Sequence, residues 1–208
     1  MLNYLRDGQE IYRQSFSIIR AEANLSRIPP DLEKLTVRVI HACGMTDIVD
    51  NLRFSNNAGN AGRAALSAGA PILCDTKMVA EGIKLSRLPA RNIVRCTLSD
   101  PRVPDLAKQL GNTRSAVALE LWRPYLANSI AVIGNAPTAL FYLLDMIHAG
   151  APHPALILGF PVGFVGAAES KILLSANNLS VPYITLLGRR GGSAIAAATV
   201  NALGIDTE

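Results

Sequence analysis

Residues 130–148 read IAVIGNAPTALFYLLDMIH, and this stretch decides the fold. The apolar run 130–133 predicts a short buried strand, and the Gly-Asn-Ala-Pro sequence of 134–137 predicts a turn. Residues 138–148 predict an apolar helix. A strand, a glycine-containing turn and a helix thus follow one another within nineteen residues.

The same unit occurs twice more before the end of the chain. Strands are predicted at 155–158 and 183–187, glycine-rich turns at 159–166 and 188–192, and helices at 169–176 and 193–203. Successive units of this kind imply right-handed crossovers and a parallel sheet. The strands are apolar throughout instead of alternating, which indicates helices on both faces of the sheet.

The first part of the chain is predicted to be helical. Helices are expected at 4–23, 30–43 and 59–68, then strands at 71–74 and 92–98 and a helix at 113–121. We find no linker. The prediction is therefore one α/β domain over 1–208, with a mainly parallel sheet flanked by helices on both faces and a helical N-terminal part.

Composition excludes several classes of protein. Half of the 208 residues are hydrophobic and 17% are charged, which excludes a disordered chain. A net charge of +4 without Lys/Arg runs argues against nucleic-acid binding. The uncharged stretches 124–144 and 146–168 are interrupted by Gly and Pro, so we predict no membrane span. Three cysteines without a CxxC motif predict free thiols and a cytoplasmic location. The sequence shows no cluster of metal-ligating residues, so we predict no metal site.

The glycine-rich turns predict where a ligand binds. Ligands of open parallel sheets bind beyond the carboxyl ends of the strands, where helix N-termini favour anions. Arginine, which outnumbers lysine by 15 to 5, suits bidentate binding of carboxylates. The P-loop, GxGxxG and GxSxG motifs are absent. Two alternatives remain open: the glycines serve only tight turns, and the arginines reflect base composition.

His41 is the histidine with the most suggestive surroundings, in the sequence Val39-Ile40-His41-Ala42-Cys43-Gly44. A helix C-terminus favours the imidazolium, whereas apolar burial favours the neutral ring. These opposing effects suit a group that donates or accepts a proton near neutral pH. A buried structural histidine is the alternative interpretation.

Several segments together carry a resemblance to a known family, precorrin-8X methylmutase of corrin (vitamin B12) biosynthesis. The resemblance runs from about residue 4 to residue 203. Its segments are 15–22 (SFSIIRAE), 41–44 (HACG), 64–75 (AALSAGAPILCD), 111–116 (GNTRSA), 134–140 (GNAPTAL), 159–171 (GFPVGFVGAAESK) and 188–194 (GRRGGSA).

The resemblance implies an isomerase that needs no cofactor. Members move a methyl group from C-11 to C-12 of precorrin-8X, or of cobalt-precorrin-8, to give hydrogenobyrinate or cobyrinate. The family works as a homodimer whose active sites are shaped by both subunits. Its catalytic histidine corresponds to His41, which would act as a general acid.

The same resemblance suggests substrate-binding residues. Arg114, Arg189 and Arg190 are expected to bind the carboxylates of the substrate, and Ser15 is a further polar contact. Asn135 and Thr138 would offer an amide and a hydroxyl. Lys84 stands where the family has a threonine, so Lys84 or Ser86 would replace that hydroxyl. Two other functions remain open: a corrinoid-binding protein without catalysis, and an unrelated anion-binding enzyme. The sequence does not separate metal-free from cobalt-containing substrates.

Overall fold

The structure is a computed structural model that describes residues 2, 4–176 and 179–204. Its strands are β1 (Leu52–Phe54), β2 (Ile72–Cys74), β3 (Val94–Cys96), β4 (Ile130–Ile133), β5 (Leu156–Gly159) and β6 (Tyr183–Leu186). Its α-helices are α1 (Gly8–Glu22), α2 (Glu33–Cys43), α3 (Ala58–Ser67), α4 (Lys77–Gly82), α5 (Val103–Leu110), α6 (Arg114–Val117), α7 (Pro137–His148), α8 (Ala167–Ala176) and α9 (Ser193–Leu203). Short 3₁₀ helices are η1 (Leu25–Arg27), η2 (Thr46–Asn51), η3 (Leu85–Arg87) and η4 (Ala118–Tyr125).

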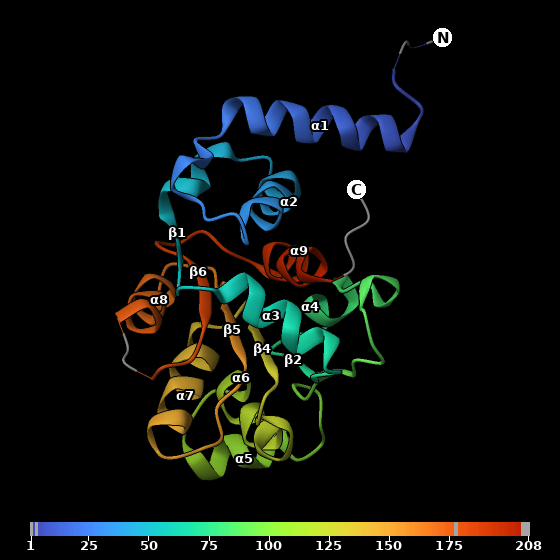
Figure 1. The fold of residues 1–208 in the computed structure, drawn as a ribbon. Coiled ribbons are helices and arrows are strands. Elements are labelled where there is room, and N and C mark those ends of the chain that lie inside the picture. The colour runs from blue at the N-terminus through green and yellow to red at the C-terminus, as the bar shows by residue number, and fades with distance from the viewer. Residues whose placement is uncertain (1, 3, 177–178, 205–208) are drawn as a thin grey trace.

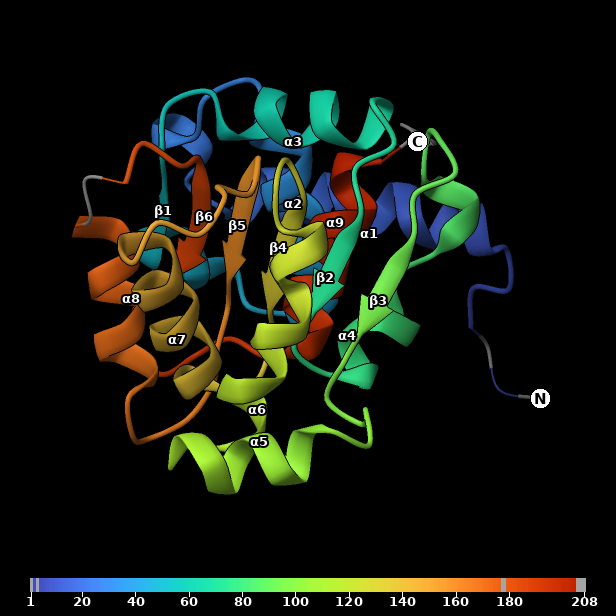
Figure 2. The ribbon, with the colours of Figure 1, turned by 90° about the horizontal axis from the view of Figure 1, so that it is seen from below.

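The six strands form one sheet in the order β1-β6-β5-β4-β2-β3, as Figure 2 shows. All pairs are parallel except β1 with β6. The predicted α/β fold with a mainly parallel sheet is therefore confirmed, and the three strand–turn–helix units correspond to β4–α7, β5–α8 and β6–α9.

Helices cover both faces of the sheet (Figure 1). On β4, Ile130 and Val132 pack into one apolar cluster with residues of α2, α3 and α9. Ala131 and Ile133 face the other way, into a second cluster with residues of η4, α7 and α8. Successive side chains of a strand point to opposite faces, so a strand covered on both sides needs apolar residues at every position.

The predicted element boundaries hold best in the second half of the chain. The first helix begins at Gly8 instead of residue 4, because the Asp7 side chain accepts the Gln9 N–H at 2.9 Å and caps the helix there. The helix predicted at 113–121 is split between α6 and η4. The edge strand β1 and the helices α4 and α5 were not predicted. None of the helices within the described residues is long and apolar enough to cross a bilayer.

Candidate active site

His41 lies in the last turn of α2, which ends at Gly44. Gly44 has φ +69°, and its N–H donates to the Ile40 carbonyl at 2.7 Å, so glycine makes the predicted helix end possible. Val39 and Ile40 are buried, whereas His41 is exposed. Successive residues of a helix point in different directions, so the apolar neighbours of His41 do not bury it. The interpretation of His41 as a buried structural histidine is therefore wrong.

Helix α1 supplies the surroundings of the imidazole. The Ser15 hydroxyl lies 2.8 Å from Nδ1 of His41, within hydrogen-bonding distance. The Phe16 ring meets the imidazole edge-on at 5.4 Å between centroids, and the Tyr12 ring lies tilted at 5.1 Å. Residues 12, 15 and 16 share one face of α1, because positions three and four apart lie above one another. That face orients the His41 ring.

Three adjoining hollows surround this pair of helices. The His41 pocket, of about 180 Å³, connects α1, α2, η3 and α9 and is lined by Tyr12, Arg38, His41, Ala42, Lys84, Arg87, Ala198 and Asn201. The arginine pocket, of about 520 Å³, shares Tyr12, Arg38 and Arg87 with it and adds Gln9, Arg13, Phe16 and Arg20. The α1 groove, of about 460 Å³, contains Ser15 and His41 among mainly apolar side chains such as Ile11 and Ile18.

Two more predicted residues fall at this place. Lys84 lines the His41 pocket and so faces the same hollow as the imidazole. Ser86 is exposed in the adjacent helix η3. Neither role is tested by these positions alone, and both remain predictions.

Arg114 and Thr138 form a second group on the opposite face of the sheet, and Asn135 lies in the turn at the carboxyl end of β4. Arg114 begins α6, and Thr138 lies in the first turn of α7. The Thr113 hydroxyl donates to Thr138 Oγ1 at 2.8 Å, which ties α6 to α7. Helices α6 and α7 lie on the side of the sheet away from α1 and α2 (Figure 1). One chain therefore does not bring this group and His41 to the same pocket.

The turn between β4 and α7 already holds an anion of the protein itself. Asp75 is 2% exposed, and its carboxylate accepts the N–H groups of Gly134, Asn135 and Ala136 at 2.8, 2.9 and 2.9 Å. Burial raises the pKa of Asp75, and the three N–H groups oppose that rise. The sequence predicted that this turn suits an anion. Asp75 takes that position, which leaves the Asn135 side chain, and not the turn backbone, for a substrate.

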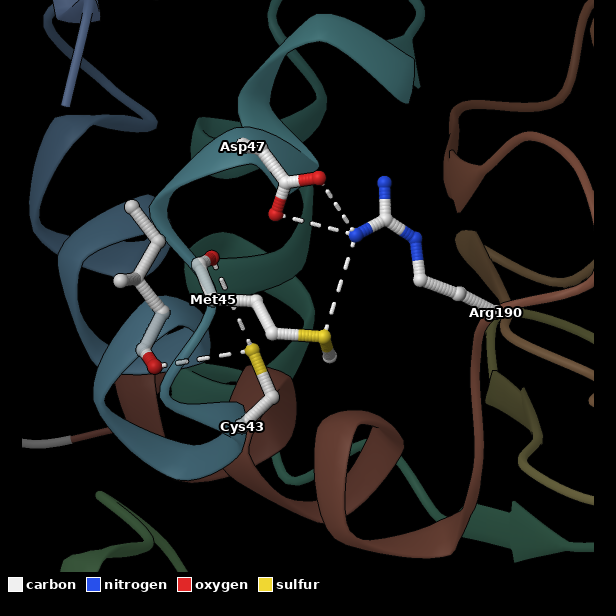
Figure 3. Close-up of polar contacts among 5 residues, drawn as sticks. Cys43, Met45, Asp47 and Arg190 are labelled. Carbon is white, nitrogen blue, oxygen red and sulfur yellow. Dashed lines mark hydrogen bonds and ion pairs between the residues drawn. The ribbon is translucent and has the colours of Figure 1, made fainter.

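Arg189 and Arg190 lie in the turn after β6. Arg189 stacks over the ring of Phe164 at 5.2 Å. Nη1 of Arg190 donates to both carboxylate oxygens of Asp47, at 2.8 and 3.0 Å, and lies 3.8 Å from Sδ of Met45 (Figure 3). Arg190 thus joins the strand-end turn to the segment that follows α2. A substrate carboxylate at Arg190 would have to use nitrogens other than Nη1.

A buried lysine holds two of the glycine-rich turns together. Lys171 of α8 has no exposed surface, and its Nζ donates to the carbonyls of Pro161 and Arg190 at 3.0 and 2.7 Å. The Gly192 N–H also donates to the Phe160 carbonyl at 2.8 Å. Burial lowers the pKa of Lys171 to about 8. This lysine was not singled out in the sequence.

The pockets add arginines that sequence reasoning missed. Arg38 lies one turn before His41 on α2, and its guanidinium lies 5.4 Å over the Phe16 ring. Residues three apart on a helix lie on the same face, so the position of Arg38 relative to His41 was a signal in the sequence that could have identified it. Arg87 comes from the distant helix η3, and no motif in the sequence marks it.

Comparisons with known proteins match nearly the whole chain. Residues 10–205 match the model of the family described as CbiC, precorrin-8X methylmutase. A protein of Pseudomonas aeruginosa named precorrin-8X methylmutase is 71% identical over 208 residues, which cover 100% of both chains. A Sinorhizobium protein of the same name is 57% identical over 201 residues, which cover 97% of this chain and 96% of the relative.

A solved structure has the same fold. The crystal structure of a precorrin-8x methyl mutase from Thermus thermophilus superposes with a TM-score of 0.86 at 37% identity. The match covers 97% of this chain and 100% of that one.

Proposed function

Because the chain belongs to the precorrin-8X methylmutase family, whose members are isomerases of cobalamin biosynthesis, we propose that His41 is the general acid of its reaction. In this proposal the enzyme moves the methyl group of precorrin-8X from C-11 to C-12 and releases hydrogenobyrinate. The observation that carries the proposal is the exposed imidazole, which is hydrogen-bonded through Nδ1 and borders a cation-lined pocket.

The reaction type suits this set of residues. The migrating methyl group stays on one molecule, so the protein needs no nucleophile and no methyl carrier. A proton donated to a ring nitrogen would stabilise the charge that develops as the conjugated system rearranges. General acid catalysis of this kind contributes roughly 10²- to 10⁴-fold. Positioning of the macrocycle would supply much of the remaining acceleration.

Ser15 determines which nitrogen of His41 gives its proton to the substrate. We assign the imidazolium as the acid, in which Nδ1–H donates to the Ser15 hydroxyl oxygen, so that transfer of the Nε2 proton leaves a neutral ring protonated on Nδ1. No residue within the described ranges is hydrogen-bonded to Nε2. The proton on Nε2 is therefore the one available to the substrate.

We propose the metal-free compound as substrate. The relatives that are 71% and 57% identical are both named for precorrin-8X. The carboxylates on the rim, which both compounds share, match the arginines and the lysine that border the His41 pocket, so the choice rests on the names of these two relatives. Turnover of precorrin-8X and cobalt-precorrin-8 by the same preparation tests this choice, and preference for the cobalt compound would contradict it.

We further propose a homodimer in which each active site takes residues from both subunits. Arg114 and Thr138 belong to helices that cover the face of the sheet away from His41, so a single macrocycle could reach both sides only if a second copy supplied one of them. Phe164 and Val165 are 83% and 88% exposed, and large exposed apolar side chains favour association. A cytoplasmic location agrees with the three free cysteines.

The direct test uses the purified protein alone. Conversion of precorrin-8X, followed by the absorption change to hydrogenobyrinate, would support the isomerase. We expect His41→Ala to bind the product yet lose at least about 100-fold in kcat, while His153→Ala, in an exposed loop, behaves like wild type. Binding without any conversion by wild type would indicate a corrinoid-binding protein instead. Tight binding of a simple nucleotide but of no corrinoid would indicate an unrelated enzyme.

A further inference from the structure

Arg87 occupies a distinctive position between two hollows. It ends the short helix η3 and lines both the His41 pocket and the arginine pocket. Its Nη1 is buried and has no hydrogen-bond partner among the described residues. Buried polar groups are nearly always paired, and an unpaired one on a cation needs a specific explanation.

The backbone that carries Arg87 is firmly held by α9. The Asn201 side chain donates to the Gly82 carbonyl at 2.9 Å and accepts the Lys84 N–H at 2.7 Å. Gly204 lies so close that a Cβ there would come within 2.2 Å of the Arg87 carbonyl oxygen. These contacts hold the backbone at Arg87 in place. The unpaired guanidinium nitrogen therefore belongs to a side chain that projects from a rigid segment.

The Arg and Lys side chains that line the two pockets beside Arg87 are all cations. Every charged side chain that lines the arginine pocket is an arginine, and Lys84 adds another cation to the His41 pocket. Arg13 and Arg20 are neutralised by carboxylates at the rim, because they pair with Glu10 and Glu33. Within the part of the chain that the structure describes, Arg87 has no such carboxylate. A ligand that carries its own carboxylate would complete the site.

We propose that Arg87 binds a side-chain carboxylate of the substrate and so fixes the orientation of the macrocycle against His41. This inference rests on the proposed function, because it takes the substrate to be an acidic tetrapyrrole. The shared lining of the two pockets places the bound carboxylate beside the imidazole. Arg87 is thereby a specificity residue, which selects the edge of the ring that enters first.

Equilibrium binding tests the proposal without requiring turnover. Hydrogenobyrinate would be titrated into wild type, Arg87→Gln, Arg87→Lys and the control Arg27→Gln, whose arginine is exposed on η1. We expect Arg87→Gln to raise Kd about 10- to 100-fold, the range for a lost hydrogen bond to a charged group. Arg87→Lys should lie between the two, because lysine keeps the charge but not the planar donor geometry. Equal affinity of all four proteins would overturn the proposal.

Amide derivatives of the product identify a direct contact. Each derivative would have one carboxylate converted to an amide. For the derivative that lacks the partner of Arg87, wild type should lose affinity and Arg87→Gln should lose nothing further. A constant loss with every derivative would show an indirect, structural effect and overturn the proposal. Arg87→Lys gives the same comparison if Arg87→Gln does not fold.

The outcomes separate this inference from the proposed function. Arg87-dependent binding without conversion of precorrin-8X by wild type would refute catalysis and leave carboxylate recognition standing. If wild type converted precorrin-8X but the Arg87 variants bound the product as tightly as wild type does, catalysis would stand and carboxylate recognition by Arg87 would be refuted.

Discussion

The Ser15 hydroxyl lies 2.8 Å from Nδ1 of His41 and joins two helices across 26 residues of sequence. The contact lies inside an aromatic frame, because Tyr12 and Phe16 flank the same imidazole. The orientation of the ring therefore depends on how α1 packs against α2. Ser15 is a positioning residue that acts through His41.

Ser15→Ala should slow turnover without weakening substrate binding. A net hydrogen bond is worth about 1 kcal/mol, which corresponds to a decrease in kcat of about 5- to 10-fold. The measurement is steady-state conversion of precorrin-8X across a range of pH. Because the Ser15 hydroxyl oxygen accepts from Nδ1–H of the imidazolium, its loss should change the pH profile of kcat as well as its height. Ser17→Ala, on an exposed position of the same helix, serves as the control. A rise in KM with unchanged kcat would contradict the role of Ser15.

Asp75→Asn should destabilise the fold. The two carboxylate oxygens of Asp75 accept three backbone N–H groups in a buried turn, and an asparagine keeps only one oxygen. At least one buried N–H then faces an amide group that cannot accept from it, which costs about 1–3 kcal/mol. Urea unfolding measures the loss, with the exposed Asp145→Asn on α7 as control. Equal stability of the two variants would show that the carboxylate is dispensable.

The sequence predicted the strand–turn–helix units well because each is a local pattern. Residues 130–148 contain their own strand, turn and helix, and the structure follows them closely. Strand β1 has only three residues and pairs antiparallel with β6, more than a hundred residues later, so no local pattern marks it. Short edge strands of this kind are decided by tertiary contacts.

The candidate site was predictable only in part for the same reason. The HACG segment identified His41 through the resemblance, but its exposure depends on which way one residue of α2 points. Asp75 reaches its turn from about sixty residues away, so the turn could be recognised as suited to an anion but not as already filled. Arg87 meets the His41 pocket only because α9 positions η3 beside α2.

Lys171→Met should destabilise the protein more at pH 10 than at pH 7.5. The pKa of Lys171 is lowered to about 8 in the folded state, while that of an exposed lysine is about 10.4. Between these values the unfolded chain binds more protons, so the contribution of Lys171 to the free energy of unfolding rises with pH. The rise has an upper limit of about 3 kcal/mol.

Urea unfolding of wild type and Lys171→Met at both pH values measures this difference. Other groups also titrate in this window, but they are common to both proteins and cancel in the comparison. The exposed Lys108→Met is the control and should show the same difference from wild type at each pH. If Lys171→Met destabilised the protein equally at both pH values, the pKa of Lys171 would not be lowered in the folded state.

A mixture of two inactive variants should recover activity if the active sites are shared between subunits. His41→Ala removes the proposed acid, and Arg114→Ala removes a proposed substrate contact on the other face of the sheet. In a mixed dimer both changes fall in one site, and the second site is intact. Random exchange at equal concentrations makes half of the dimers mixed, so about a quarter of wild-type activity is expected.

The mixture is measured after subunit exchange and is compared with each variant alone. The matched control is a mixture of His41→Ala with Ser15→Ala. These two residues contact each other within one chain, so they belong to the same active site. That pair leaves each site of a mixed dimer with one defect, so its mixture should never exceed the mean of the two variants. Absence of recovery for the His41 and Arg114 pair, in dimers shown to exchange, would contradict the sharing of active sites between subunits.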